Sequence, residues 1–271
     1  MRITFYQPQY WPRLHYFARA LNSDVFVLSD SAQYTKKLVF QLPDGPKRSS
    51  SHQVHAPIKL AIGSHNLSVP VVNELSPISA TQVGYQVDWV TTHLNSLSSA
   101  YGKAKYFPDF FPIVEKFLKT HPASLADLNC GTIDLAINYL LGIKTDWKSP
   151  TESITSENLK KADKFRLKLL MRDSDTGIKK PEGKNTANEW MVEICQKFGA
   201  TEYFCGGTAH EAYMKPEVFE AAGVSISVQD WKCLPYTQRF TKEVGFLPNL
   251  SILDLLFNVG PEEAAAILQD D

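Results

Sequence analysis

The chain has 271 residues, with 28 Lys plus Arg against 29 Asp plus Glu, and 44% of its residues are hydrophobic. This composition is typical of globular proteins and excludes disordered, collagen-like and coiled-coil chains. The formal net charge of −1 gives no long-range attraction to phosphate backbones or anionic lipids, so we expect no nucleic-acid partner.

The amino-terminal region and the cysteines narrow the class further. The opening apolar run is short and ends at Gln7-Pro8, and no window approaches the ~20 apolar residues that a membrane helix needs. The cysteines show no CxxC pair and no metal-ligand spacing; they are Cys130, Cys195, Cys205 and Cys233. We therefore expect free thiols, no metal site, no membrane insertion and a cytoplasmic location.

The first seventy residues predict a parallel crossover followed by a β-rich excursion. Residues 3–6 are predicted to form a strand that ends at Pro8, because proline cannot donate to a central ladder. A helix over 13–21 and a buried strand over 24–28 complete a unit of the size of a right-handed crossover. Turn residues at 43–46 and alternating apolar positions then predict a β-hairpin excursion over 31–70.

The middle of the chain is predicted to be helical and then irregular. Apolar residues recur at helical spacing in three stripes between 85 and 142, which indicates a helical insertion. The stretch 147–185 is polar and charged, which favours an exposed loop region. Its run Lys179-Lys180-Pro181-Glu182-Gly183-Lys184 is interpreted as part of that loop and not as a basic binding face.

A second alternation of helices and strands follows from residue 186 onward. Thr186 and Glu189 form a T-x-x-E capping box before a helix that Gly199 ends. Strands are expected over 201–204 and 224–228, with a helix between them near 210–214. Ser251 and Asp254 form a second capping box before the last long helix. We predict an α/β fold over 1–271 as one domain, with a mostly parallel sheet formed by both ends of the chain, a β-hairpin excursion and a helical insertion.

Polar residues follow four of the predicted strands, where parallel sheets bind their ligands. They are Gln7 and Gln9, Asp30, Cys205 with Gly206-Gly207, and Gln229-Asp230. If these strands are neighbours, the residues converge on one cleft, although strand ends are commonly polar for other reasons. His15 lies on the first helix after the first strand, like a histidine of the H-x-G-H element of nucleotidyltransferases, whose first histidine and glycine are absent here.

Other histidines and one cysteine allow both a chemical and a structural interpretation. His93 lies four residues after Trp89, on one helix face, so it could act as a general base or be a satisfied core histidine. His52 and His55 have no further ligand pattern that would complete a metal site. Cys205 beside glycines suits a nucleophile, but without a visible base a small buried thiol explains it as well.

Several segments, taken in order, resemble the WbqC-like family of bacterial proteins. The segment 7–12 (QPQYWP) resembles the family's QPxYLPW signature, and 30–36 (DSAQYTK) resembles its DDVQYxK segment. Trp89-x3-His93 and the stretch 101–107 are similar to its W-x3-H…Y-x-x-A-x-Y-F pattern. Residues 203–206 (YFCG) with Tyr213 resemble YxSG…Y, and Tyr236-x-Gln238 with 250–260 (LSILDLLFNVG) resembles the closing YxQ and LSILDLLFNxG.

The resemblance implies a context in O-antigen and other surface-polysaccharide biosynthesis, for which transfer of glycine onto sugar has been suggested. Two departures from the family pattern bear on this. The family's FQNRN segment is replaced by 40–44 (FQLPD), with the nearest arginine at Arg48 after an apparent insertion. The family serine of YxSG is Cys205, which argues against an obligatory nucleophile at that position.

The leading hypothesis is therefore a transferase that moves an aminoacyl or acyl group to an amine in polysaccharide or amino-sugar biosynthesis. His93 is expected to be the base, and Asp30 is expected to orient it or to bind an ammonium group. The expected substrate-binding residues are Gln7, Tyr10, His15, Gln33, Tyr34, Lys36, Arg48, Gly206, Tyr213 and Gln238. The expected substrate is a small molecule or a nucleotide sugar, and no cofactor is indicated. Nucleotidyl transfer from ATP and a non-catalytic binding or scaffold role are the alternatives.

Overall fold

A five-stranded parallel sheet forms the centre of the protein. Its strands, in chain order, are β1 (Arg2–Tyr6), β2 (Val25–Leu28), β7 (Leu169–Arg172), β8 (Glu202–Cys205) and β9 (Ser225–Val228). The order in space is β7-β2-β1-β8-β9, so the chain builds outward from β1 first in one direction and then in the other. The predicted α/β fold, with a parallel sheet formed by both ends of the chain, is confirmed.

The structure is a computed structural model that describes residues 1–42, 45–72, 76–144, 148–183 and 186–269, without the side chains of 37–42, 47–50 and 153. In the described part, no helix combines the length and the apolar character that crossing a bilayer requires.

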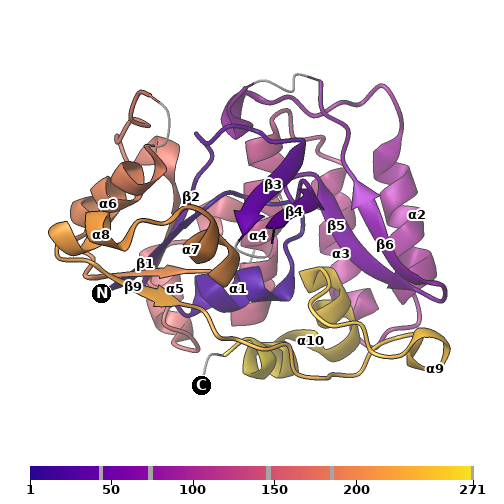
Figure 1. Ribbon diagram of the computed structural model, residues 1–271. Helices are drawn as coiled ribbons and strands as arrows, with labels where there is room; N and C mark the ends of the chain where they lie inside the picture. Colours follow the sequence, from indigo (N-terminus) through magenta and orange to yellow (C-terminus); the bar gives the residue numbers. More distant parts are fainter. Residues whose placement is uncertain (43–44, 73–75, 145–147, 184–185, 270–271) are drawn as a thin grey trace.

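Helices cover both faces of the sheet. Successive side chains of a strand point to opposite faces, and β1 shows which helix lies on each. The Phe5 ring lies 4.8 Å from that of Trp190 in α6 (Ala187–Phe198), whereas the Tyr6 ring lies 5.4 Å from that of Tyr16 in α1 (Leu14–Leu21). Thus α1 and α6 cover opposite faces, and α8 (Pro216–Ala221) lies beside α6 (Figure 1).

The predicted excursion and helical insertion lie between β2 and β7. The excursion consists of two antiparallel hairpins, β3 (Lys37–Leu42) with β4 (Gly45–Ser50) and β5 (His55–Leu60) with β6 (Gly63–Ser68). The insertion contains α2 (Trp89–Tyr101), α3 (Phe107–Leu118) and α4 (Leu125–Leu141). Helices α2 and α3 lie with β5 and β6 on the side of the molecule away from α6 and α8, and α4 lies nearer its centre (Figure 1). The shorter helices are η1 (Ile78–Ala80), η2 (Pro150–Ser153), α5 (Ser156–Ala162), η3 (Asp173–Asp175), α7 (Gly207–Tyr213) and α9 (Thr241–Val244).

The stretch 147–185 differs from the exposed loop expected from the sequence. It contains α5 and also β7, which pairs with β2 from Val25↔Leu169 to Leu28↔Arg172. Leu170 of β7 is buried. The strand has four residues and charged neighbours at both ends, so its apolar pattern is too short to stand out in a polar stretch.

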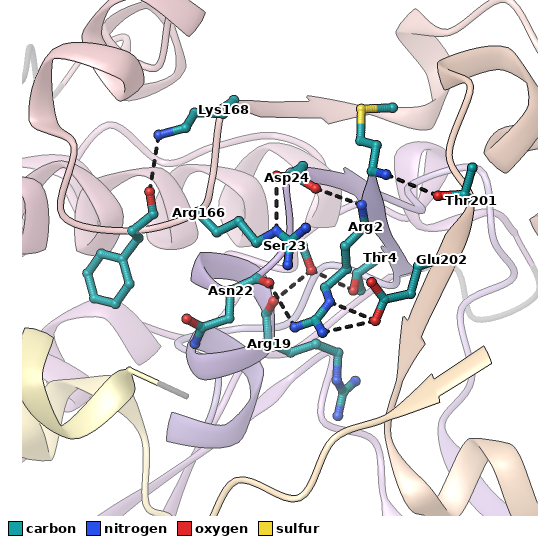
Figure 2. Close-up of polar contacts among 12 residues, drawn as sticks. Arg2, Thr4, Arg19, Asn22, Ser23, Asp24, Arg166, Lys168, Thr201 and Glu202 are labelled. Atoms are coloured by element: carbon teal, nitrogen blue, oxygen red, sulfur yellow. Dashed lines mark hydrogen bonds and ion pairs between the residues drawn. The ribbon is translucent and has the colours of Figure 1, made fainter. Parts of the chain in front are cut away.

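Charged pairs gather at the amino-terminal end of the sheet, away from the carboxyl ends of the strands. Arg2 pairs with Glu202 at 2.9 Å, and Arg166 pairs with Asp24 at 3.0 Å (Figure 2). The Arg2 backbone N–H also donates to Asp24. Burial alone would raise the pKa of Asp24, but its hydrogen bonds to Arg166 and Arg2 lower it. This end joins β1, β2 and β8 through local charge pairing.

The carboxyl-terminal helix α10 (Ile252–Leu268) is kinked at Gly260. The Gly260 backbone has φ of 75° and ψ of −174°, a conformation that essentially only glycine adopts. A Cβ at this position would lie 2.5 Å from the ring of Tyr106. The Tyr106 backbone N–H in turn donates to the carbonyl of Phe257. The glycine of the LSILDLLFNxG resemblance is therefore required by packing.

Asp254 at the start of α10 was expected to cap the helix together with Ser251. Only Ser251 does so, and the Asp254 side chain is the centre of a buried hydrogen-bond network. Ser251 caps the helix through Leu253 N–H, as a capping residue does. The Asp254 carboxylate instead accepts from Tyr101 (2.9 Å), Tyr236 (2.6 Å) and Gln238 (2.9 Å).

Gln238 links that carboxylate to a buried cation. Lys59 is completely buried, and its ammonium donates to Oε1 of Gln238 at 2.9 Å. The other end of the same amide, Nε2, donates to Asp254. An amide can accept at one end and donate at the other, so glutamine suits a bridge between a lysine and an aspartate. Gln238, expected to bind substrate, lies in this buried network and does not line the cleft described below.

Candidate functional site

A cleft of about 690 Å³ opens at the carboxyl ends of the sheet strands. It is lined by Tyr6 and Gln7 at the end of β1, by Ser29 after β2, and by Thr208 and Ala209 after β8. From β1 the chain adds β2 and β7 on one side and later β8 and β9 on the other, so the strand order reverses between β1 and β8. This is the topological switch point, where open parallel sheets bind ligands. Its volume falls within the range of small-molecule pockets. We refer to it as the strand-end cleft.

Amide side chains line part of the strand-end cleft and orient one another. The Thr35 backbone N–H donates to Oε1 of Gln53 at 3.0 Å, so Nε2 of Gln53 is the donor to Oε1 of Gln7 at 2.7 Å. This relay leaves the Gln7 NH2 group as a donor without an acceptor in the described part of the chain. Gln53 is 2% exposed, and its backbone is held as well, because the Asn129 side chain of α4 donates to the Gln53 backbone carbonyl.

Lysine, histidine and aromatic side chains form another part of the lining. His52, Lys180 and Lys215 line the cleft, and none of its described lining residues is Asp or Glu. The Lys180 ammonium lies 5.9 Å from the centre of the Trp190 ring. The Asn188 side chain of α6 accepts from the Lys215 backbone N–H at 2.9 Å and donates to the Tyr213 backbone carbonyl at 3.1 Å. It therefore holds the segment that contains Tyr213 and Lys215 against α6. The lining suits a ligand with hydrogen-bond acceptors and negative charge.

Three of the expected site residues line the strand-end cleft, namely Gln7, Gln33 and Tyr213. Tyr34, although buried, does not line it, and neither does the exposed Lys36. Arg48 lies on β4 opposite Val39, but its side chain lies outside the described residues. Gly206 packs against Arg19, since a Cβ at Gly206 would lie 2.5 Å from Nη2 of the guanidinium.

His93 and Tyr10 lie together outside the strand-end cleft. Tyr10 is completely buried, and its hydroxyl lies 3.1 Å from Nδ1 of His93. His93 is 4% exposed and lies beside a separate pocket of about 360 Å³ between β6 and α2. Burial lowers the pKa of His93 to about 4, and a hydrogen bond to the Ser68 backbone partly opposes this shift. The structure therefore favours the structural interpretation of the W-x3-H spacing, in which His93 holds Tyr10.

This burial predicts a pH-dependent contribution of His93 to stability. Unfolded histidine takes up a proton near pH 6.5, whereas the folded histidine remains neutral down to about pH 4. The contribution is therefore complete above about pH 6.5 and is lost as the pH falls toward 4. We expect the stability difference between wild type and His93→Gln to shrink by about 3 kcal/mol over this range. Urea unfolding at pH 7 and pH 4 measures it, and an unchanged difference would contradict the assignment.

Asp30 lies behind the cleft wall in a reciprocal contact with η3. Its carboxylate accepts from the Ser174 N–H at 3.1 Å and the Ser174 hydroxyl at 2.9 Å, while Asp173 accepts from the Ser31 N–H at 2.9 Å. Burial raises the pKa of Asp173, and the hydrogen bond with the Asp30 carboxylate raises it further. Asp30 is 1% exposed and is not near His93 in any described contact, so it is placed to anchor the loop after β2.

The amino-terminal end of α1, where the nucleotidyl-transfer alternative would place a phosphate, is occupied by the protein itself. The Leu14 N–H donates to the Leu250 carbonyl, and the His15 N–H donates to the Asn249 side chain. The His15 imidazole also contacts the Asn249 amide at 2.9 Å. Burial, with Arg19 nearby, lowers the pKa of His15 to about 4. His15 does not line the strand-end cleft, so this helix end is not available to a phosphate.

Comparison with known proteins identifies the family. The model of the WbqC-like protein family matches residues 7–266, nearly the whole chain. The chain belongs to the WbqC-like protein family. It is also 27% identical over 266 residues to a protein of Mycobacterium tuberculosis (strain ATCC 25618 / H37Rv) named "Uncharacterized protein Rv1507c", covering 96% of this chain and 95% of that one. No solved structure matches the chain.

Some residues of the family motifs line the strand-end cleft, and others make buried contacts elsewhere in the protein. Gln7 of the QPxYLPW resemblance and Gln33 of the DDVQYxK resemblance line the strand-end cleft. The W-x3-H and YxQ resemblances supply the buried contacts of His93 and Gln238. The cleft residues that sequence reasoning missed are Gln53, His52, Lys180, Asn188, Trp190 and Lys215. The pair Lys179-Lys180 is a sequence signal for one of them, although such a charged run is also typical of an exposed loop.

Proposed function

We propose that the protein is a transferase of surface-polysaccharide or amino-sugar biosynthesis, and that the strand-end cleft is its active site. The observation that carries the proposal is a cleft at the topological switch point with amide and cationic lining and no carboxylate among its described lining residues. The resemblance to the WbqC-like family supports transfer of an aminoacyl or acyl group to an amine. The substrate is a small molecule that carries the accepting amine.

The chemistry requires a base, donors for a developing oxyanion and a rigid frame. The amine nitrogen attacks the acyl carbon, the new N–C bond forms, and the bond from that carbon to the leaving oxygen or sulfur breaks. The proton of the amine passes to a base and from there to the leaving group. His52 supplies the one imidazole among the described residues of the cleft lining, so we assign the base to His52 in place of His93.

Two of the glutamines that line the cleft supply donors for the oxyanion. The Gln7 NH2 group is oriented by the relay from Thr35 through Gln53. Gln9 lines the cleft and is 5% exposed, and no acceptor for its amide lies in the described part of the chain. Preorganised donors of this kind stabilise charge that develops in the transition state, because they need no reorganisation during the reaction.

A direct transfer assay tests the proposal. The purified protein is incubated with a glycyl thioester or acyl thioester and glucosamine 1-phosphate, and mass spectrometry follows N-acylation of the sugar. We expect product to form faster with the protein than without it, and Gln53→Ala to lower the rate because it disorders Gln7. The exposed Gln196→Ala on α6 is the matched control. Equal product with and without protein across several amino sugars and acyl donors would contradict the function.

A further inference from the structure

The amino-terminal end of α6 opens into the strand-end cleft. The predicted capping box is not formed, because the Thr186 hydroxyl donates to the Pro181 carbonyl and makes no capping bond to the helix. Thr186, Ala187 and Asn188 all line the cleft. The N–H groups of 187, 188 and 189 have no acceptor in the described part of the chain. Glu189, the acidic residue of this turn, is exposed and does not line the cleft.

One further donor at the cleft is buried without a partner in the described part of the chain. Trp190 lies in the same turn of α6 and is 5% exposed, and its indole N–H has no hydrogen-bond partner. Gln9 also lines the cleft, from the loop after β1, and its amide has no acceptor in the described part of the chain. A buried donor left without an acceptor costs about 1–3 kcal/mol. The unpartnered N–H of Trp190 therefore indicates that a ligand completes the site.

Cations flank this helix end on both sides. Lys180 lies over the Trp190 ring, and Lys215 is held to α6 through Asn188. A third cation, Arg19, is 5% exposed behind the cleft, where it lies 5.1 Å from the centre of the Tyr6 ring and donates to Gln229 at 2.8 Å. No carboxylate pairs with Lys180, Lys215 or Arg19 in the described part of the chain. The helix end and the two lysines that line the cleft produce a positive potential at this end of the cleft.

We infer that the α6 end of the strand-end cleft binds the phosphoryl group of a phosphorylated or nucleotide-linked sugar. The inference rests on the proposed function, for which it names the substrate class. A carboxylate has two oxygens and one charge, whereas this end presents several N–H donors and two lysines. A phosphoryl group, with three terminal oxygens and nearly two charges at neutral pH, uses more of them. In the described part of the chain, the amino-terminal end of α6 is free to bind this group, whereas that of α1 is occupied by the protein itself.

Phosphate binding by variants at Ala187 tests the site without any assay of transfer. The probes are inorganic phosphate, glucosamine 1-phosphate and acetate, measured by titration calorimetry at pH 7.5. We expect Ala187→Glu to weaken phosphate binding at least about tenfold, because its carboxylate would occupy and repel at the helix end. Ala187→Gln, equal in size and neutral, should stay within about threefold of wild type. An acidic residue in the first turn also stabilises a helix, so the melting temperature should not fall.

The lysines provide an independent comparison. Lys180→Gln and Lys215→Gln are each expected to weaken phosphate binding about fivefold to tenfold, whereas the exposed Lys197→Gln at the far end of α6 should leave it unchanged. The sugar phosphate should bind more tightly than free phosphate, and acetate should bind most weakly. Equal phosphate affinities of Ala187→Glu and Ala187→Gln would overturn the inference. Absence of acyl transfer with intact, charge-dependent phosphate binding would overturn the proposed reaction and leave this site standing.

Discussion

Replacing His52 by Gln is expected to lower the rate of acyl transfer about 100-fold, the lower end of what a general base contributes. His52 lines the strand-end cleft together with Gln7 and Gln53, and we propose that its imidazole accepts the proton of an attacking amine. Glutamine preserves the approximate size of the side chain but cannot accept that proton. The initial rate of N-acylation at saturating sugar phosphate measures the effect, and the phosphate affinity should stay within about twofold of wild type.

The comparison variants for His52 are two other histidines. His55 lies on β5, is bonded to Ser68 at 2.8 Å and does not line the cleft, so His55→Gln should retain the full rate. His93→Gln separates the two hypotheses for the base, because His93 holds Tyr10 outside the cleft. A large loss of rate in His93→Gln together with an unchanged rate in His52→Gln would return the assignment of the base to His93.

Removal of the Asp254 carboxylate is expected to lower the free energy of unfolding by about 3–5 kcal/mol, as the loss of one partner of a buried charge network does. Asp254→Ala leaves two tyrosine hydroxyls and the Gln238 amide without their acceptor. It also removes the larger of the two carboxylate charges that stabilise the buried Lys59 ammonium, and leaves only that of Glu243. Burial lowers the pKa of Lys59, and the nearby Asp254 opposes that shift. Urea unfolding followed by circular dichroism at pH 7 measures the change.

An exposed ion pair on the same helix is the control for Asp254. Glu262 on α10 pairs with Lys164 at 2.8 Å, but its side chain is 84% exposed. Exposed pairs contribute less than about 1 kcal/mol, so Glu262→Ala should change stability within that limit. If Asp254→Ala were as mild as Glu262→Ala, the buried network would not join the carboxyl-terminal segment to β5 as described.

The central strands and long helices could be predicted because their patterns are strong and local. The buried run of β2 and the apolar stripe of α1 are visible in the sequence alone. β7 could not be predicted in this way, because four residues between charged neighbours carry too little periodicity. The capping box predicted from the T-x-x-E pattern at Thr186 was also wrong, because the Thr186 hydroxyl donates to the Pro181 carbonyl instead.

Cleft residues that directly follow a strand could be predicted from the sequence. Cleft residues that distant segments bring to the same place could not. Gln7 follows β1 directly, so its position at the switch point follows from the order of the elements. Gln53 and Lys180 reach the same cleft from the excursion and from the loop before α6, and no local spacing brings such segments together. For His93, helical spacing correctly gave a shared face with Trp89, but it could not show that this face packs on Tyr10.

A crystal structure with glucosamine 1-phosphate bound would show where the protein holds its substrate. We predict that the sugar phosphate occupies the strand-end cleft, with its phosphoryl group at the α6 end near Lys180 and Lys215 and its amine near His52. Density for the sugar phosphate at the amino-terminal end of α1 beside His15, or in the pocket between β6 and α2 beside His93, would contradict it.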